Sequence, residues 1–297
     1  MHILVCNDTL TELRTWPDNT FNCCVTSPPY WGLRDYGVDG QLGLEKTPEE
    51  YVHNLTEVFR EVKRVLRTDG TLWINLGDTY AANRSYQVTD NKHIDVGNTQ
   101  AMHASDIGLK PKDLCGIPWR VAFALQADGW WLRSDIIWSK PNPMPESVTD
   151  RPTRSHEYIF LLTKSAKYWY DTEAIKEESK YPEDDRKARS NVTDKRMPTE
   201  QIAGVRPGSQ TYPLRNKRSV WNVATAPFKG AHFATFPPKL IEPCILAGCP
   251  VGGIVIDPFG GSMTVGMVCK KHDRDFVGID LNPKYVQMGE ERIERGK

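Results

Sequence analysis

Hydrophobic positions recur along the chain with two different spacings, one typical of strands and one typical of helices. Short apolar runs that fit buried strands lie at 3–6, 22–25, 69–78, 130–138, 155–164, 254–256 and 276–279. Segments with the apolar spacing of amphipathic helices lie at 48–66, 118–127, 238–247, 262–271 and 283–295. Because strands and helices alternate, the pattern predicts an α/β fold, with a mostly parallel sheet covered by helices on both faces.

The segment 48–66 carries the clearest helix signals. Thr47 has a hydroxyl that can cap the helix, Pro48 suits the first helical position, and Glu50 stands three residues after the cap. A stripe of apolar residues follows at helical spacing, and the Asp-Gly pair at 69–70 ends the segment. Nothing in this helix indicates a catalytic role.

Two polar stretches interrupt the alternation. The first, 79–114, is rich in Asn, Asp and His and is interpreted as an insertion. The second, 171–219, begins with an acidic part, after which residues 186–218 hold nine Lys and Arg against two acidic residues. Because the whole chain has a formal net charge of zero, this local patch is where DNA phosphates would bind, unless it is only a solvated insert. The residues predicted to contact DNA are Arg186, Arg206, Arg215, Lys217 and Arg218.

Residues 26–31, TSPPYW, follow a predicted strand and are the most informative stretch of the sequence. Pro28 and Pro29 lack N–H groups and have a fixed φ, so the hydroxyl of Ser27 and nearby carbonyl groups are presented as acceptors beside the ring of Tyr30. Acceptors next to an aromatic face suit a planar amine, such as that of a nucleobase extruded from its stack. By itself, a Pro-Pro pair explains no more than the end of a strand.

A second motif, GIVIDPFGGSMTVG at 253–266, has the pattern of a strand, a glycine turn and a helix. The Gly260-Gly261 pair lets the backbone approach a ligand closely, and a helix N-terminus after it favours a negative group such as a carboxylate. The next strand ends in Asp280, at the place where a doubly wound fold binds ribose hydroxyls. The spacing fits a nucleoside cofactor, and it would also fit NAD.

Together the two motifs resemble those of the DNA amino-methyltransferases, which transfer a methyl group from S-adenosyl-L-methionine to an exocyclic base nitrogen. The catalytic SPPY precedes the cofactor motif DPFGGS, an order similar to that of the β group of the family. The family usually has Gly where Met263 stands and Thr where Val265 stands. The resemblance covers most of the chain, with further matching segments at 7–8, 69–78, 136–145, 155–164 and 232–245.

The resemblance implies a Rossmann-like, S-adenosyl-L-methionine-dependent methyltransferase sheet with helices on both faces and an inserted target-recognition region. The implied parts are a catalytic half at 1–170 that includes the insertion, a target-recognition insert at 171–219 and a cofactor-binding half at 220–297. The implied catalytic loop is Ser27, Pro28, Pro29 and Tyr30. The implied cofactor site is Asn7, Asp8, Asp257, Phe259, Gly260, Gly261, Ser262, Asp280 and Asn282.

In this family, a serine at the first position of the catalytic motif favours cytosine N4, and an aspartate favours adenine N6 or either base. The sequence therefore predicts sequence-specific methylation of cytosine N4 in double-stranded DNA by base flipping and direct in-line transfer, with adenine N6 as the alternative. Ser27 Oγ and the Pro28 carbonyl would accept the amine hydrogens while Tyr30 stacks on the base. Trp31 would widen that stacking surface, unless it is only an exposed tryptophan at a domain junction. Methylation at cytosine C5 would need a Pro-Cys pair on the catalytic loop, and Pro243-Cys244 lies elsewhere.

Other classes of protein explain only part of the sequence. A nicotinamide dehydrogenase would use the glycine turn but gives no reason for SPPY, and a non-catalytic DNA-binding protein explains the basic insert but not the cofactor motif. Methyltransferases that act on RNA or on a protein amide have a similar loop that usually begins with Asn, whereas this chain has Ser27.

Composition agrees with an intracellular enzyme. At 297 residues and 39% hydrophobic content the chain can form one domain with an insertion, and its seven cysteines have no CxxC spacing, so we expect reduced core thiols and no metal. No apolar run approaches the roughly 20 residues that cross a membrane, and the first residues lack a signal-peptide layout. We expect a cytoplasmic protein of bacterial, archaeal or phage origin, and leave open a homodimer and a cognate restriction endonuclease as partners.

Overall fold

The computed structural model describes residues 1–33, 35, 37–81, 108–179, 183–184, 210–211, 213–225 and 236–295. The chain divides into a larger unit, Met1–Asp171 with Ser219–Lys297, and a smaller unit, Thr172–Arg218. The bounds of the smaller unit differ by one residue at each end from those of the predicted insert.

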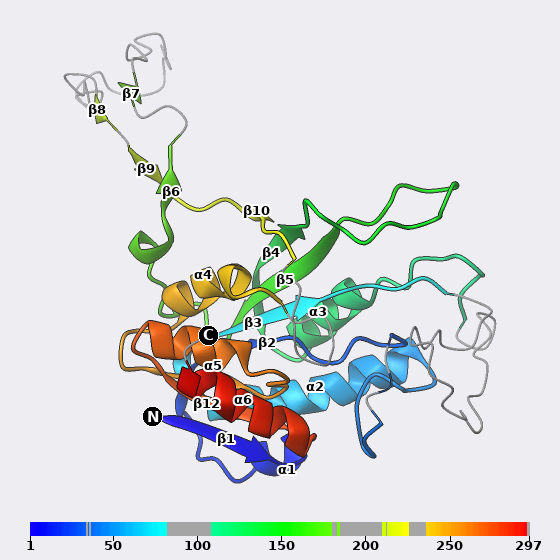
Figure 1. The fold of residues 1–297 in the computed structure, drawn as a ribbon, viewed down its shortest axis with the longest axis horizontal. Coiled ribbons are helices and arrows are strands. Elements are labelled where there is room, and N and C mark those ends of the chain that lie inside the picture. The colour runs from blue at the N-terminus through cyan, green and yellow to red at the C-terminus, as the bar shows by residue number, and fades with distance from the viewer. Residues whose placement is uncertain are drawn as a thin grey trace, which may run out of the picture. The chain divides into compact units, whose positions relative to one another are not determined.

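In the larger unit, eight strands of the described part of the chain form one sheet (Figure 1). The five strands from β1 to β3 in this sheet run parallel, β5 runs antiparallel to both neighbours, and β10 runs parallel to β4. The predicted mostly parallel sheet is confirmed, although β10 was not predicted because a three-residue strand is too short to show alternation. In order across the sheet, the strands are β1 (His2–Cys6), β12 (Asp275–Asp280), β11 (Ile254–Asp257), β2 (Phe21–Thr26), β3 (Leu66–Leu76), β5 (His156–Thr163), β4 (Trp131–Ser139) and β10 (Val220–Asn222).

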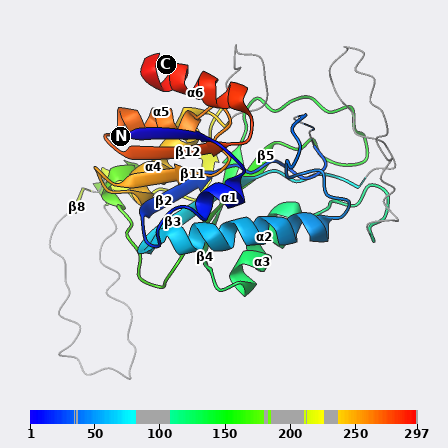
Figure 2. The same cartoon turned by 90° about the horizontal axis from the view of Figure 1, so that it is seen from below.

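Helices cover both faces of this sheet (Figure 2). One face carries α1 (Thr9–Leu13), α2 (Pro48–Val65) and α3 (Ile117–Ala127), which pack on one another in that order. The other face carries α4 (Pro238–Gly248), α5 (Thr264–Lys271) and α6 (Pro283–Arg295), which likewise pack in order. The α/β architecture that the sequence predicts is therefore the one observed.

The start of α2 has the predicted cap. The Glu50 N–H donates to Thr47 Oγ1 at 3.1 Å, and the Glu50 carboxylate accepts from the N–H of Lys46 at 3.0 Å. Helix α5 departs from its predicted start at Ser262 and begins at Thr264 instead, because Met263 has left-handed backbone angles that a helix cannot include.

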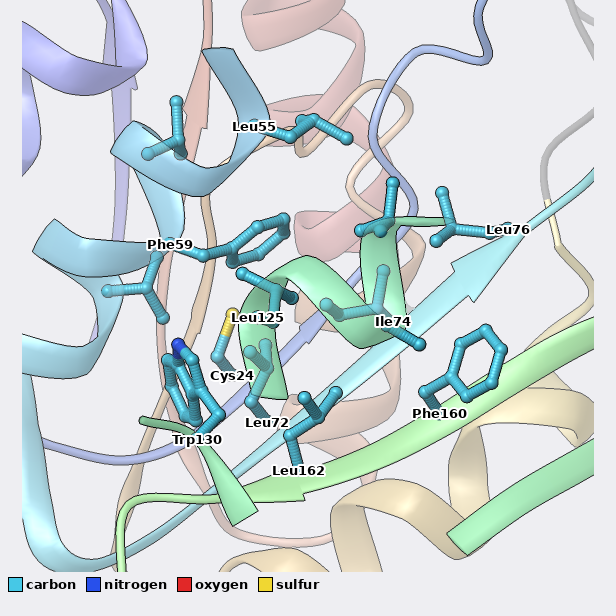
Figure 3. Close-up of a cluster of buried hydrophobic side chains, with 14 of the residues drawn as sticks. Cys24, Leu55, Phe59, Leu72, Ile74, Leu76, Leu125, Trp130, Phe160 and Leu162 are labelled. Carbon is cyan, nitrogen blue, oxygen red and sulfur yellow. The ribbon is translucent and has the colours of Figure 1, made fainter. Parts of the chain in front are cut away.

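A hydrophobic core lies between the sheet and the helices α2 and α3 (Figure 3). Phe59 and Leu125 from the helices pack towards Leu72 and Phe160 of the strands, and burying each such side chain contributes about 1.5–3 kcal/mol. Trp31 belongs to this core, with 3% of its surface exposed, so the expectation of an exposed Trp31 was wrong. Six of the seven cysteines are buried as free thiols, and Cys6 is exposed.

Strand order determines which residues meet at the edge of the sheet where the parallel strands end, called here the functional edge. The carboxyl ends of β2, β3, β11 and β12 lie together, because these strands are parallel neighbours. Strand β5 is antiparallel, so its first residues lie at this same edge, with Glu157 opposite Trp138 and Tyr158 opposite Leu76. Residues more than 100 positions apart in the sequence are thereby brought into one site.

The described residues of the smaller unit form two short antiparallel strand pairs. Strand β6 (Glu177–Glu178) pairs with β9 (Leu214–Arg215), and β7 (Glu183–Asp184) pairs with β8 (Gln210–Thr211). The acidic start of the insert therefore lies alongside its basic end, and charges that are separated in the sequence are adjacent in space. Two residues predicted to contact DNA, Arg186 and Arg206, lie outside the described residues.

Only the ends of the predicted 79–114 insertion belong to the described part of the chain. Tyr80 forms an isolated bridge with Leu114, and the Ala81 N–H donates to the Asp113 carbonyl at 2.8 Å. Among the described residues, none of the helices combines the length and apolar character needed to cross a membrane.

Candidate active site

A cavity of about 540 Å³ opens at the functional edge of the sheet. Its volume falls in the range of sites for cofactors and small molecules. The cavity is also lined by residues that the sequence did not predict. These include Leu33 and Leu42 of the loop after Tyr30, and Asn54 and Val58 of α2. The predicted site residues that line the cavity are Asp8, Ser27, Pro28, Pro29, Tyr30, Phe259, Gly260, Gly261, Ser262, Asp280 and Asn282.

The predicted catalytic loop, residues 27–30, is held in place by contacts outside the cavity. Tyr51, a buried residue of α2, donates its hydroxyl hydrogen to the Pro29 carbonyl at 2.7 Å. On the other side, the Gly32 N–H donates to the Gly43 carbonyl at 2.9 Å, and Gly43 has a φ of +98° and lies against the Tyr30 carbonyl. The α2 helix, in which the sequence indicated no functional role, therefore positions the SPPY loop.

Tyr30 is held by both its ring and its hydroxyl. A Cβ atom added at Gly77, after β3, would lie 2.5 Å from the Tyr30 ring, so only glycine leaves room for the ring at this place. The hydroxyl lies 2.8 Å from Glu157 Oε2 and 3.1 Å from Asn75 Oδ1, and it accepts from Ser27 Oγ at 3.5 Å. Burial raises the pKa of Tyr30 well above its ordinary value, and the Glu157 carboxylate adds to the rise.

Sequence reasoning missed Glu157 and Asn75. Glu157 lines the cavity, forms an ion pair with Lys140, and accepts from Asn75 Nδ2 at 3.3 Å. Asn75 is 4% exposed and also donates to the Tyr158 carbonyl at 3.0 Å. The available signals were a polar Asn near the end of an apolar strand and a charged residue at the start of another, but neither says which residues meet.

Asp257 connects β2 to the cofactor turn. It is 1% exposed, and its Oδ1 accepts from Thr26 Oγ1 at 2.7 Å and from the Phe259 N–H at 3.1 Å. Burial raises the pKa of Asp257 to about 7, although these two hydrogen bonds oppose the rise. Asp257 does not line the cavity, so its contribution to the site is to hold the start of the turn.

The glycine turn is closed by hydrogen bonds and open towards the cavity. The Gly260 N–H donates to the Ile279 carbonyl at 2.8 Å, and the Met263 N–H donates to the Gly260 carbonyl at 2.7 Å. A Cβ added at Gly261 would meet nothing closer than the Phe259 carbonyl at 4.0 Å, so there is room for a ligand to approach this backbone.

Met263 stands in the turn with a φ of +56°, a conformation that costs most residues about 1–2 kcal/mol. Its side chain is fully buried and occupies space that three glycines leave free. Added Cβ atoms at Gly260, Gly278 and Gly289 would lie 2.4, 2.6 and 2.1 Å from Met263 atoms. Burial of the thioether side chain offsets the backbone strain, so the turn accommodates a methionine at the position where the resemblance led us to expect glycine.

Asp280, which is predicted to contact ribose hydroxyls, lines the cavity. Its two carboxylate oxygens accept one N–H each, from Gly261 and Asn282, both at 2.8 Å, so both oxygens retain lone pairs for a ligand. Burial raises the pKa of Asp280, while these N–H groups oppose the rise. Asp8 caps α1 through the Thr11 N–H and also lines the cavity.

Asn7 does not line the cavity. Its Nδ2 donates to Glu12 Oε2 at 3.0 Å, and its Oδ1 accepts from the Asp8 N–H at 2.9 Å. The structure thus places Asn7 behind Asp8, where it orients the start of α1.

Comparisons with known proteins agree with this arrangement. Residues 21–291 match the N6/N4 methyltransferase family model, described as DNA methylase. The chain is 52% identical to the type II methyltransferase M.Cfr9I of Citrobacter freundii, over 97% of this chain and 86% of that protein. It is 47% identical to M.SmaI of Serratia marcescens, over 98% of this chain and 90% of that protein.

Two solved structures share the fold. The cytosine-N4-specific PvuII DNA methyltransferase aligns with a TM-score of 0.64 at 17% identity, over 100% of this chain and 93% of its own. A putative DNA modification methylase of Thermus thermophilus, in complex with S-adenosyl-L-methionine, aligns with a TM-score of 0.61 at 24% identity, over 100% and 96%. The chain therefore belongs to the N6/N4 family of DNA methylases, whose methyl donor is S-adenosyl-L-methionine.

Proposed function

We propose that this DNA methyltransferase methylates the exocyclic N4 of cytosine in double-stranded DNA. The observation that carries the proposal is a single cavity lined by both the SPPY loop, with Ser27 and Tyr30, and the cofactor turn, with Gly261 and Asp280. Ser27 at the first motif position favours cytosine over adenine, and the structural neighbour named above as cytosine-N4-specific is consistent with this choice.

The chemistry requires acceptors for the amine hydrogens, because the lone pair of an exocyclic amine is conjugated with the base. Ser27 Oγ and the Pro28 carbonyl would accept these hydrogens as the nitrogen becomes tetrahedral, and the Tyr30 ring would hold the flipped base by stacking. Bound S-adenosyl-L-methionine supplies an electrophilic methyl group. The loop contributes mainly by holding the amine in line with that methyl group, which can provide roughly 7–11 kcal/mol at best.

Each implied part of the chain receives a role in this proposal. Residues 1–170 carry the catalytic loop, 220–297 carry the cofactor turn, and β1 of the first part pairs with β12 of the last. The insert at 171–219 would recognise the target sequence and bind phosphates through Arg215, Lys217 and Arg218. We also propose that the protein acts in the cytoplasm beside a cognate restriction endonuclease, because its relatives are named type II methyltransferases. A homodimer stays a prediction.

Product analysis tests the proposal. The purified protein is incubated with labelled S-adenosyl-L-methionine and unmethylated DNA, with RNA as a parallel substrate, and the digested product is examined by mass spectrometry. We expect N4-methylcytosine in DNA alone. Folded Ser27→Ala protein is the control, and it should bind cofactor and DNA but turn over more slowly, since the lost contact strengthens in the transition state. N6-methyladenine as the product would refute the base assignment.

A further inference from the structure

We infer that Glu157 is the terminal proton acceptor of a hydrogen-bonded chain that begins at the target amine and passes through Ser27 and Tyr30. The inference rests on the proposed N4 methylation. A methylated exocyclic nitrogen carries one proton too many, and a site that removes this proton as the methyl group arrives assists the reaction. The structure contains a continuous path for that proton.

The path begins in the cavity and leads outwards. Ser27 Oγ donates to the Tyr30 hydroxyl oxygen at 3.5 Å, and the Tyr30 hydroxyl donates to Glu157 Oε2 at 2.8 Å. Ser27, Tyr30 and Glu157 all line the cavity. The first distance is long for a hydrogen bond between oxygens, and such contacts commonly shorten once substrate is bound.

Glu157 can end the path, whereas Asn75 cannot. Asn75 Oδ1 lies 3.1 Å from the Tyr30 hydroxyl, but an amide does not take up a proton near neutral pH. Asn75 instead fixes the two partners, because its Nδ2 donates to Glu157 Oε2. The Glu157 side chain is 16% exposed, and its Lys140 partner is 19% exposed, so water can take the proton onward.

Tyr30 passes the proton on without becoming charged. Burial and the nearby Glu157 carboxylate both raise the pKa of its hydroxyl, so the group stays protonated at neutral pH. It receives a hydrogen from Ser27 as it gives its own to Glu157. The ring therefore has two functions, a stacking surface for the base and a carrier for the proton.

An N–CH₃ bond forms, and the donor sulfur keeps the electron pair of the broken S–CH₃ bond. One N–H bond of the amine breaks, and its proton moves to Ser27 Oγ, the Ser27 proton to the Tyr30 oxygen, and the Tyr30 proton to Glu157 Oε2. Glu157 becomes a neutral carboxylic acid and then returns the proton to water. No oxidant or metal is required.

Single-turnover kinetics of Tyr30→Phe and Glu157→Gln test the inference. Tyr30→Phe keeps the stacking ring, and Glu157→Gln keeps an acceptor for the Tyr30 hydroxyl but cannot take up its proton. General-base catalysis contributes roughly 10²–10⁴-fold, so each change should slow methyl transfer by about a hundredfold or more. Dissociation constants for cofactor and DNA should change by less than about threefold. The double variant should be no slower than the slower single variant, because both changes interrupt one path.

Glu242→Gln is the matched control. Glu242 of α4 forms an ion pair with Lys271 of α5, and it does not line the cavity. Its transfer rate and solvent deuterium isotope effect should equal those of the wild type, whereas Tyr30→Phe should have a smaller isotope effect than the wild type. If Glu157→Gln does not fold, Tyr30→Phe decides the question alone. Transfer by folded Tyr30→Phe at the wild-type rate would overturn the proton path. Absence of N4-methylcytosine from the wild-type reaction would overturn the proposed function instead.

Discussion

Asp257 shows how one buried residue makes stability depend on pH. Its carboxyl group lies under the cofactor turn, where Thr26 and Phe259 both donate to the same oxygen, and burial raises its pKa from the ordinary 3.8 to about 7. Between these two values the folded protein keeps a proton that the unfolded chain has released. By linkage, the contribution of Asp257 to the free energy of unfolding falls as pH rises through this window, and it is constant above it.

The variant Asp257→Asn isolates this effect. An asparagine Oδ1 can accept both hydrogen bonds but cannot ionise, so the stability of the wild type relative to the variant should fall from about pH 4 to about pH 7. Denaturant unfolding at several pH values measures it. The exposed Asp39→Asn is the control, whose stability profile should parallel that of the wild type. Parallel profiles for wild type and Asp257→Asn would show that Asp257 does not titrate in this window.

At the scale of elements, the cofactor turn depends on packing between β11, β12, α5 and α6. Met263 supplies the contact, since its side chain lies where Gly260, Gly278 and Gly289 leave space. Gly289 belongs to α6, so a helix distant in sequence supports the turn that faces the cavity. Without that space, a methionine at φ +56° would have no burial to offset its strain.

The pair Met263 and Gly289 should therefore be energetically coupled. Gly289→Ala should destabilise the protein by about 1–3 kcal/mol despite better helix propensity, because the new methyl group would overlap Met263 Cγ, and should weaken cofactor binding. Met263→Gly relieves the backbone strain but leaves a cavity, with a net loss of about 1–3 kcal/mol. The double variant should lose about 0.5–3 kcal/mol less stability than the two single variants lose together. Thermal unfolding and calorimetry measure these terms, and strict additivity would contradict the coupling.

At the scale of the whole molecule, charge is arranged differently from its order in the sequence. The chain is neutral overall, and the basic end of the insert is predicted to bind phosphates. Yet Arg215 Nε and Arg218 Nε both lie close to Glu177 Oε1, at 3.0 and 2.6 Å. These exposed or half-exposed pairs add little stability, and a phosphate can compete with Glu177 for the same guanidinium groups.

Variants of this cluster test DNA binding. Replacing Arg215, Lys217 and Arg218 by Gln should lower DNA affinity. The slope of the logarithm of the binding constant against the logarithm of the salt concentration should become shallower by about 0.9 per lost phosphate contact. Glu177→Gln should raise affinity, because it removes the competing carboxylate from two arginines. Glu178→Gln, the same charge change on the next residue, is the control and should have a smaller effect. DNA titrations over a series of salt concentrations measure both, and an unchanged slope for the triple variant would separate this cluster from the DNA.

Local patterns in the sequence were sufficient for most elements and both motifs. The seven predicted strands, the cap of α2 and the burial of six of the seven cysteines all depend on residues close together along the chain. Their periodicity and capping chemistry can be recognised without a partner. The SPPY loop and the glycine turn are contiguous motifs of the same kind. Their meeting in one cavity follows from parallel neighbouring strands, which the α/β pattern already implied.

Only the tertiary structure decided which distant residues complete the site. Glu157 reaches Tyr30 because β5 runs antiparallel beside β3, and Gly77 receives the ring because of where β3 ends. Met263, which precedes α5, is accommodated by Gly289 of α6, and the acidic strand β6 pairs with the basic strand β9. Each of these contacts depends on strand order, direction and register, which arise from long-range packing. Sequence spacing records distance along the chain, so it determined the elements and motifs, and folding alone determined which of their side chains touch.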